Sequence, residues 1–206
     1  AREPYDIQGV GTLRMRYVGG DRGDDGWAYV RSVRRTRRLS GGAWMDPIGG
    51  TDQLNDEISI YSPYPTWYPK YTYLGKRFIL AVANGKGVAW QNDNPTNPFP
   101  YLDIQNAPYW NPKNRWEPRE VHVVEATMPE EHPYARRVYY FDANGWIPYF
   151  GECYDKRGEF VKALMNDARP IVGMDGPTSF GIEESAGYSI DFKRNHATIF
   201  CQGKVS

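Results

Sequence analysis

The sequence predicts a mainly β protein built on one large, curved antiparallel sheet. Aromatic residues make up 15% of the 206 residues, and Gly (21) and Pro (16) are plentiful. Apolar residues also recur at a period of two between closely spaced turns, which is typical of half-buried strands. Strands do not alternate with helical patterns, so a parallel βαβ sheet is not expected. We expect a single β domain over residues 1–206 with few short helices and long loops rich in aromatic residues and proline.

The first expected strands, residues 11–18 and 27–33, form a hairpin around a turn at 19–21. The second strand is partly apolar on both faces, because Ala28 and Val30 alternate with larger side chains. The large apolar side chains of the hairpin are Leu13, Met15, Tyr17, Trp27 and Tyr29. A strand of this composition is expected to be covered on both sides.

Four arginines follow the second strand, and an acidic loop comes after them. The arginines are Arg34, Arg35, Arg37 and Arg38, and the acids are Asp46, Asp52, Asp56 and Glu57. Alternation along a continued strand would split the arginines between its two faces. The chain has 25 Lys+Arg and 25 Asp+Glu, so its formal net charge is zero. We therefore expect intramolecular ion pairs between the two groups, ahead of a lipid head group or other acidic ligand, with nucleic acid least favoured.

If such a pair is partly buried, Arg35→Ala or Arg37→Ala should lower stability by about 1–3 kcal/mol.

The remaining strands are expected at residues 58–61, 71–82, 88–90, 120–127, 136–141, 146–154, 185–191 and 197–202. Asn84-Gly85 and Asn144-Gly145 mark hairpin turns. Residues 159–166 fit a helix or a strand, and the hairpins before them favour a strand. Residues 92–118, rich in Asn, Pro and aromatic residues, are expected to form a packed insertion or a lid.

Residue patterns typical of catalysis or metal binding are absent from the sequence. His122, His132 and His196 are scattered without the spacing of metal ligands. Neighbouring acids such as Asp56-Glu57 would point to opposite faces of a strand, whereas a glycosidase needs two facing carboxyl groups. We therefore expect a protein that is not an enzyme, with no cofactor and no metal.

Cys153 and Cys201 are too far apart for a CxxC motif, and they are compatible with one disulfide or with two buried thiols. The sequence has no run of about 18 apolar residues that could cross a membrane as a helix. Residues 1–4 lack the profile of a signal peptide, and a signal peptide that was removed would leave no trace.

Strands that are apolar on both faces, with few helices to cover them, favour a curved sheet around a hydrophobic cavity. An ordinary packed core is the alternative. The candidate residues lining a cavity are Leu13, Met15, Tyr17, Trp27, Tyr29, Phe78, Leu80, Val121, Val123 and Tyr140. A second hypothesis is a carbohydrate-binding or carbohydrate-active domain that uses Trp67, Tyr68, Trp110 and Trp116. A third is a structural partner in a complex of the cell envelope.

The sequence resembles a bacterial family of uncharacterised periplasmic proteins related to outer-membrane lipoprotein-sorting proteins. The segments that carry the likeness are 24–30 (DDGWAYV), 33–40 (VRRTRRLS) and 50–52 (GTD), with Asp46 and Asp56. More general matches follow at residues 73–77, 139–141 and 154–155.

The resemblance implies the fold of the Lol-type lipoprotein carriers, an unclosed half-barrel whose concave face takes up acyl chains or other hydrophobic cargo. It also implies a periplasmic protein active in transport and outer-membrane biogenesis, of which this chain is the C-terminal portion. The expected partners are a lipid or hydrophobic small molecule and envelope transport proteins. No catalytic residue carries over.

Overall fold

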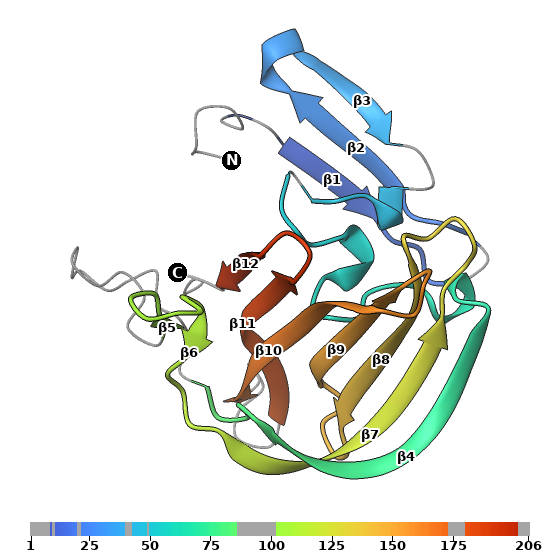
Figure 1. Ribbon diagram of the computed structural model, residues 1–206. Coiled ribbons are helices and arrows are strands. Elements are labelled where there is room, and N and C mark those ends of the chain that lie inside the picture. Colours follow the sequence, from blue (N-terminus) through green and yellow to red (C-terminus); the bar gives the residue numbers. More distant parts are fainter. Residues whose placement is uncertain are drawn as a thin grey trace.

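A seven-stranded antiparallel sheet dominates the structure, which is a computed structural model. It describes residues 9, 11–19, 22–39, 43–48, 50–85, 102–172 and 180–201. The strand order is β12-β11-β10-β9-β8-β7-β4. The strands are β4 (Lys70–Ala81), β7 (Glu117–Thr127), β8 (Tyr134–Asp142), β9 (Pro148–Asp155), β10 (Phe160–Val172), β11 (Phe180–Asp191) and β12 (His196–Cys201). Figure 1 shows β4 and β7 bending through a wide arc. The prediction of a large, curved, unclosed antiparallel sheet is confirmed.

Both faces of this sheet are largely apolar at its centre. The register aligns one row of side chains across five strands: Val124, Tyr139, Gly151, Leu164 and Ser189. The neighbouring row, on the other face, consists of Val123, Tyr140, Phe150, Met165 and Tyr188. We call the face of the first row the loop face, because residues 43–68 pack against it, and the face of the second row the opposite face.

The loop face is covered by a segment without long regular structure. It contains three short 3-10 helices, η3 (Ala43–Met45), η4 (Asn55–Glu57) and η5 (Pro65–Trp67). Leu54, Ile60 and Tyr68 from this segment share a core cluster with Tyr139 and Leu164 of the sheet. These side chains bury the apolar surface of the loop face.

The prediction of a strand at residues 58–61 is wrong. Ser59 and Ile60 have positive φ angles of 50° and 69°, and the Ile60 amide donates to the carbonyl of Glu57 at 2.8 Å. The chain turns here because the side chains before and after it are both held against the loop face.

The opposite face is covered by residues 102–116, which contain the short strands β5 (Leu102–Asp103) and β6 (Asn111–Pro112). Leu102 and Trp110 pack with Met165 and Tyr188. Residues 82–85, which follow β4, reach across to β10, where the amides of Gly85 and Ala168 donate to the carbonyls of Ala168 and Val82 at 2.7 and 2.8 Å. The strand expected at 88–90 and part of the segment 92–118 lie outside the described residues.

A separate three-stranded sheet precedes these elements. It consists of β1 (Gly11–Met15), β2 (Asp25–Val30) and β3 (Arg35–Leu39) in that order. The predicted strand over 27–33 ends early, because η2 (Arg31–Val33) and the left-handed Arg34, with φ 47°, reverse the chain into β3.

The segment 159–166, for which a helix was also possible, belongs to strand β10 from Phe160 onward. Strand pairing on both sides decides this, since Met165 aligns with Phe150 of β9 and Tyr188 of β11. Within the described ranges, no helix is long and apolar enough to span a membrane.

Candidate functional site

An apolar pocket of about 260 Å³ lies on the loop face, between the covering segment 43–68 and the sheet. Its walls come from the covering segment and from three neighbouring strands. The lining residues are Tyr61, Pro65, Tyr71, Val124, Tyr139 and Phe141. The phenol groups of Tyr61 and Tyr71 hydrogen-bond to each other at 2.9 Å, so these polar ends are satisfied. The interior of the pocket is therefore suited to hydrocarbon.

Large apolar side chains continue from this pocket over the uncovered part of the loop face. Tyr73, Phe78 and Leu80 on β4 are 58%, 75% and 59% exposed. They align with Val124, Glu120 and Pro118 of β7, which places them on the loop face. We call Tyr73, Phe78 and Leu80 the β4 strip. Lys76, aligned with His122, lies between Tyr73 and Phe78 on the same face. Groups of exposed apolar side chains of this size commonly mark a binding surface.

Beside the strip, Trp146 is exposed and stacks on His122 with ring centroids 5.0 Å apart. The phenol of Tyr73 lies 3.0 Å from Nδ1 of His122, and Lys76 forms an ion pair with Glu120 at 3.1 Å. Polar side chains therefore lie beside the strip on β7 and, at Lys76, within it on β4, so the head of an amphipathic molecule could bind next to its apolar part.

A fully buried group of charges holds the cover in place. Arg137 on β8 donates to Asp56 through Nη1 (2.8 Å to Oδ2) and Nη2 (3.2 Å to Oδ1), and Nη2 also donates to Glu57 at 2.8 Å. Lys162 on β10 forms an ion pair with Glu57 at 3.2 Å. Two carboxylates and two cations thus neutralise one another away from water, which is the condition under which buried charges are tolerated. We call Asp56, Glu57, Arg137 and Lys162 the clasp.

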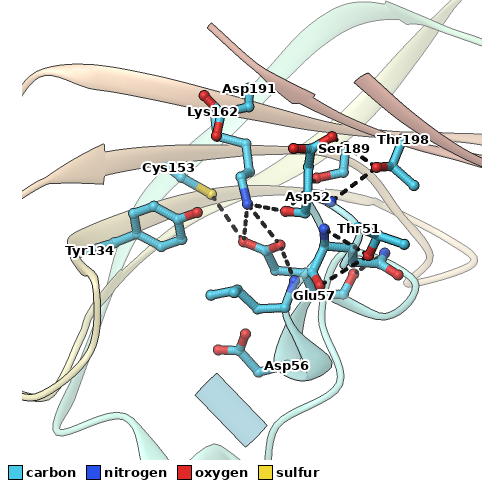
Figure 2. A network of polar contacts seen from close by, with 12 residues as sticks. Thr51, Asp52, Asp56, Glu57, Tyr134, Cys153, Lys162, Ser189, Asp191 and Thr198 are labelled. Atoms are coloured by element: carbon cyan, nitrogen blue, oxygen red, sulfur yellow. Dashed lines mark hydrogen bonds and ion pairs between the residues drawn. The ribbon is translucent and has the colours of Figure 1, made fainter. Parts of the chain in front are cut away.

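Figure 2 shows Lys162 reaching from its strand to Asp52 and Glu57 in the covering segment. Besides Glu57, its ammonium group donates to the backbone carbonyl of Asp52. Glu57 in turn accepts a hydrogen bond from the Leu54 amide at 2.7 Å. One carboxylate therefore fixes the conformation of the loop and joins it to the sheet.

Asp52 extends the same attachment to the last two strands. Its carboxylate pairs with His196 and accepts a hydrogen bond from Thr198 at 2.8 Å. Its amide donates to Thr198 at 3.0 Å, and its carbonyl accepts from Ser189 at 3.3 Å (Figure 2). The acidic loop is thus anchored to β8, β10, β11 and β12.

The electrostatics of the clasp favour charged carboxylates. Burial by itself would raise the pKa of Asp56, but the charge of Arg137 and a hydrogen bond from His132 outweigh it and hold that pKa well below its usual range. Burial lowers the pKa of His132, so this ring is neutral. Since Nδ1 of His132 accepts from the Tyr134 amide at 3.1 Å, its proton is on Nε2 and points to Asp56.

The clasp is not arranged for nucleophilic chemistry. Burial raises the pKa of Cys153, the thiol nearest to Glu57, to about 12, so it is a poor source of thiolate. In the part of the chain that the structure describes, no group of three or more His, Cys, Asp or Glu side chains could hold a metal ion. The arrangement is suited to attaching a loop.

The predicted lining residues do not come together in one place. Phe78 and Leu80 lie on the β4 strip. Val121, Val123 and Tyr140 lie on the opposite face, where the two valines are completely buried in the core. Their alternation was read correctly, but the sequence did not show which face would be filled by protein.

Leu13, Met15, Trp27 and Tyr29 lie on the three-stranded sheet and do not line the pocket. Leu13 aligns with Trp27, and Met15 with Asp25, so Leu13, Met15 and Trp27 share one face with Tyr29. Leu13, Met15 and Tyr29 are exposed. Tyr17 follows β1 and donates to Asp25 at 2.6 Å, while its backbone amide donates to the Tyr64 hydroxyl at 2.9 Å.

The ion pairs expected between the arginine block and the acidic loop are not formed. Arg38 pairs with Asp25, its neighbour across the hairpin, and Arg34, Arg35 and Arg37 have no ion pair among the described residues. Asp52 and Asp56 pair instead with the sheet, and Asp46 is exposed without an ion pair to the described residues. The hairpin formed by β2 and β3 carries the arginines away from the loop that follows them.

The four aromatic residues considered for carbohydrate binding do not form a common platform. Tyr68 is buried and donates to Asp56 at 2.6 Å. Trp67 packs against Trp44 with centroids 4.9 Å apart and the rings tilted by 32°, and Trp110 is partly buried against the core. Trp116 is exposed but lies beside Phe150 on the opposite face.

Sequence reasoning missed Arg137 and Lys162 as partners of the acidic loop. Both residues lie in strands. Arg137 is on the same strand face as Tyr139, and Lys162 is on the same strand face as Leu164. A charged residue on the apolar side of a strand is the signal that could have identified them.

The fold defines a class of proteins with an open, curved antiparallel sheet. A putative outer-membrane lipoprotein-sorting protein domain from Vibrio parahaemolyticus is similar, with a TM-score of 0.61 and 17% identity over 96% of this chain and 64% of that chain. A LolA superfamily protein from Nitrosomonas europaea has a TM-score of 0.50 at 15% identity, over 96% of this chain and 66% of that chain. At these identities the likeness concerns the fold.

The chain belongs to the family described as "Protein of unknown function (DUF1329)", whose model matches residues 1–205. A crystal structure of a family member from Desulfovibrio piger has a TM-score of 0.60 and 17% identity, over 96% of this chain and 65% of that chain. An uncharacterised protein of Pseudomonas aeruginosa is 31% identical over 137 residues, which are 64% of this chain and 29% of that protein. The chain thus spans less than a third of this relative.

Proposed function

We propose that this protein binds a hydrophobic ligand, such as an acyl chain, in the pocket under residues 43–68 and along the β4 strip. The observation that carries the proposal is that the apolar pocket and the exposed β4 strip lie on the same face of the sheet, where Val124 of the pocket aligns with Tyr73 of the strip. A ligand that extends from Tyr73 to Phe78 would pass Lys76 and His122, which lie between them on this face.

The size of the pocket supports this proposal. An apolar cavity of about 150 Å³ is enough to hold a benzene molecule. The pocket here measures about 260 Å³, so it accommodates a ring or a short length of acyl chain, and the remainder of a longer ligand would lie on the strip.

The names of similar structures also support a carrier of lipids or lipoproteins that is not an enzyme. One similar structure is called an outer-membrane lipoprotein-sorting domain and another belongs to the LolA superfamily. By analogy with their fold, we propose a periplasmic location for this protein and a role in transport of hydrophobic molecules across the envelope. The ligand would be a lipid, an acyl chain or a lipidated protein.

Uptake of a fluorescent fatty acid by the purified protein tests the proposal. Phe78→Ser with Leu80→Ser should weaken binding by about tenfold or more, because both side chains are exposed and removing them costs the ligand apolar contact. Val124→Phe should reduce binding by filling the pocket. Mass spectrometry of solvent extracts would identify lipid that co-purifies.

A matched control is Leu13→Ser with Met15→Ser, which removes two exposed apolar side chains from the three-stranded sheet. This variant should bind the fatty acid like the wild type. Loss of binding in this control alone would move the site to the three-stranded sheet. No uptake by the wild type, together with no extracted lipid, would show that the proposal is wrong.

A further inference from the structure

The three-stranded sheet carries an arginine-rich face. Its register aligns Arg35 with Val30, Arg37 with Ala28 and Arg14 with Gly26. Since aligned residues point to the same side, Arg14, Arg35 and Arg37 share a face with Ala28, Val30 and Leu39. All three arginines are exposed, so their long side chains can reach a partner.

The charge of the chain is unevenly distributed around this sheet. Residues 11–39 contain eight arginines and three aspartates and no lysine or glutamate, which gives a net charge of +5. Because the formal net charge of the whole chain is zero, the remainder carries −5. An anionic surface would thus attract this end of the molecule and repel the rest, which favours one orientation.

The aspartates neutralise only part of this charge. Asp24 pairs with Arg16 at 2.9 Å and with Arg14 at 3.6 Å, and Asp25 pairs with Arg22 at 2.8 Å and with Arg38. Arg34, Arg35 and Arg37 are exposed and form no ion pair within the described part of the chain. Arg34 in the turn and Arg35 and Arg37 on β3 can therefore bind an anion outside the protein.

Exposed aliphatic side chains adjoin these arginines. Val33, in the turn before Arg34, is 48% exposed, and Leu39, on the same face as Arg37, is 40% exposed. The exposed aromatic side chain of this sheet, Tyr29, lies on the other face. A cationic face with aliphatic neighbours and no aromatic platform fits a lipid interface better than a nucleic acid, which is bound through stacking on aromatic rings as well as charge.

We infer that this face docks on an anionic phospholipid membrane, with Arg34, Arg35 and Arg37 on lipid phosphates and Val33 and Leu39 at the interface. Guanidinium groups bind phosphate oxygens in a bidentate manner. Each basic side chain near an anionic surface strengthens binding by about fivefold, so three act together on the order of a hundredfold. The docking surface is separate from the proposed ligand pocket.

Sedimentation of the protein with vesicles tests this inference. The wild type should bind mixed phosphatidylcholine–phosphatidylglycerol vesicles and not pure phosphatidylcholine vesicles, and binding should fall with added salt. The variant Arg34→Gln, Arg35→Gln, Arg37→Gln should bind the mixed vesicles on the order of a hundredfold more weakly. Its melting temperature should stay unchanged, because none of the three side chains is in an ion pair with a described residue.

A matched control removes three exposed cations elsewhere, by Lys113→Gln, Arg115→Gln and Arg157→Gln, which likewise have no ion pair among the described residues. It should sediment with vesicles like the wild type. Equal losses in the two variants, or equal binding of the wild type to both vesicle types, would overturn the inference. Competition by a DNA duplex but no binding to vesicles would point to nucleic acid instead. Fatty-acid uptake by the arginine variant should be normal, so this test and the test of the pocket fail independently.

Discussion

Arg137 and Asp56 are 81 positions apart in the sequence and form a fully buried, two-point ion pair, with nitrogen–oxygen distances of 2.8 and 3.2 Å. This contact joins the middle of the sheet to a covering segment whose regular structure consists of short 3-10 turns. Backbone hydrogen bonds within the segment, such as that from the Ile48 amide to the Gln53 carbonyl, hold its local turns. Side chains attach it to the sheet, and the clasp supplies buried ion pairs beside the apolar contacts of Leu54, Ile60 and Tyr68.

Arg137→Met should lower the free energy of unfolding by about 3–5 kcal/mol, because Asp56 and Glu57 would lose their buried cation. Urea denaturation followed by tryptophan fluorescence measures this, since Trp44 and Trp67 lie in the covering segment. The matched control is Arg136→Met, whose ion pair with Glu125 is partly exposed and should contribute about 1 kcal/mol or less. Equal losses in the two variants would contradict a special role for the clasp.

Asp167 should make the free energy of unfolding fall as pH rises, whereas a carboxylate in an ion pair makes it fall as pH decreases. Burial raises the pKa of Asp167 to about 6, although Asn114 and Tyr188 donate to it at 2.8 and 3.3 Å. Well below pH 4 the group is protonated in both the folded and the unfolded state and makes no difference to stability. Between about pH 4 and pH 6 the unfolded state ionises while burial keeps the folded state protonated, so stability falls, and it levels off above pH 6.

Asp167→Asn should therefore match the wild type near pH 3 and exceed it by up to about 3 kcal/mol at pH 8. The amide oxygen can accept the same two hydrogen bonds. Denaturation at both pH values measures the difference, with exposed Glu131→Gln as a control expected to show none. A difference that is the same at both pH values would show that the effect is one of packing.

Gly151→Ala should lower stability by about 1–3 kcal/mol through overpacking. A Cβ atom on Gly151 would lie 2.9 Å from Cγ2 of Ile60 and 3.3 Å from Cδ1 of Leu164. Ile60 has little freedom to move, because its own amide is hydrogen-bonded within the turn. Gly23→Ala is the control, since nothing lies within 4 Å of its added atom, and thermal melting compares the two. Equal melting temperatures would mean that residues 43–68 shift easily to accommodate the added methyl group.

Cys153 should resist thiol reagents in the folded protein, because it is completely buried and burial raises its pKa to about 12. In a Cys201→Ser background, labelling by a disulfide reagent at pH 8 should proceed only as fast as the protein opens. Adding urea should make it rapid. Prompt labelling without denaturant would show that the loop face opens locally.

The strands were predictable where local alternation and turn residues agree. Asn144-Gly145 lies in the turn between β8 and β9, and the alternation of Val121 and Val123 with polar neighbours located β7. At residues 58–61 the same type of reasoning failed, because Ser59 and Ile60 adopt positive φ under contacts made by distant side chains. The strand expected over 27–33 was also too long, since Arg34 reverses the chain.

By itself, the sequence determined the fold class, the strand-rich composition and the family likeness carried by the arginine-to-acid block, because these depend on residue types and short-range spacing. Only the tertiary structure decided which face of each strand is covered and which cation meets which carboxylate. The acidic loop pairs with Arg137 and Lys162 rather than with the arginines beside it in sequence. Ion pairing depends on distance in space, and the hairpin that carries the arginines away leaves the loop closest to the sheet.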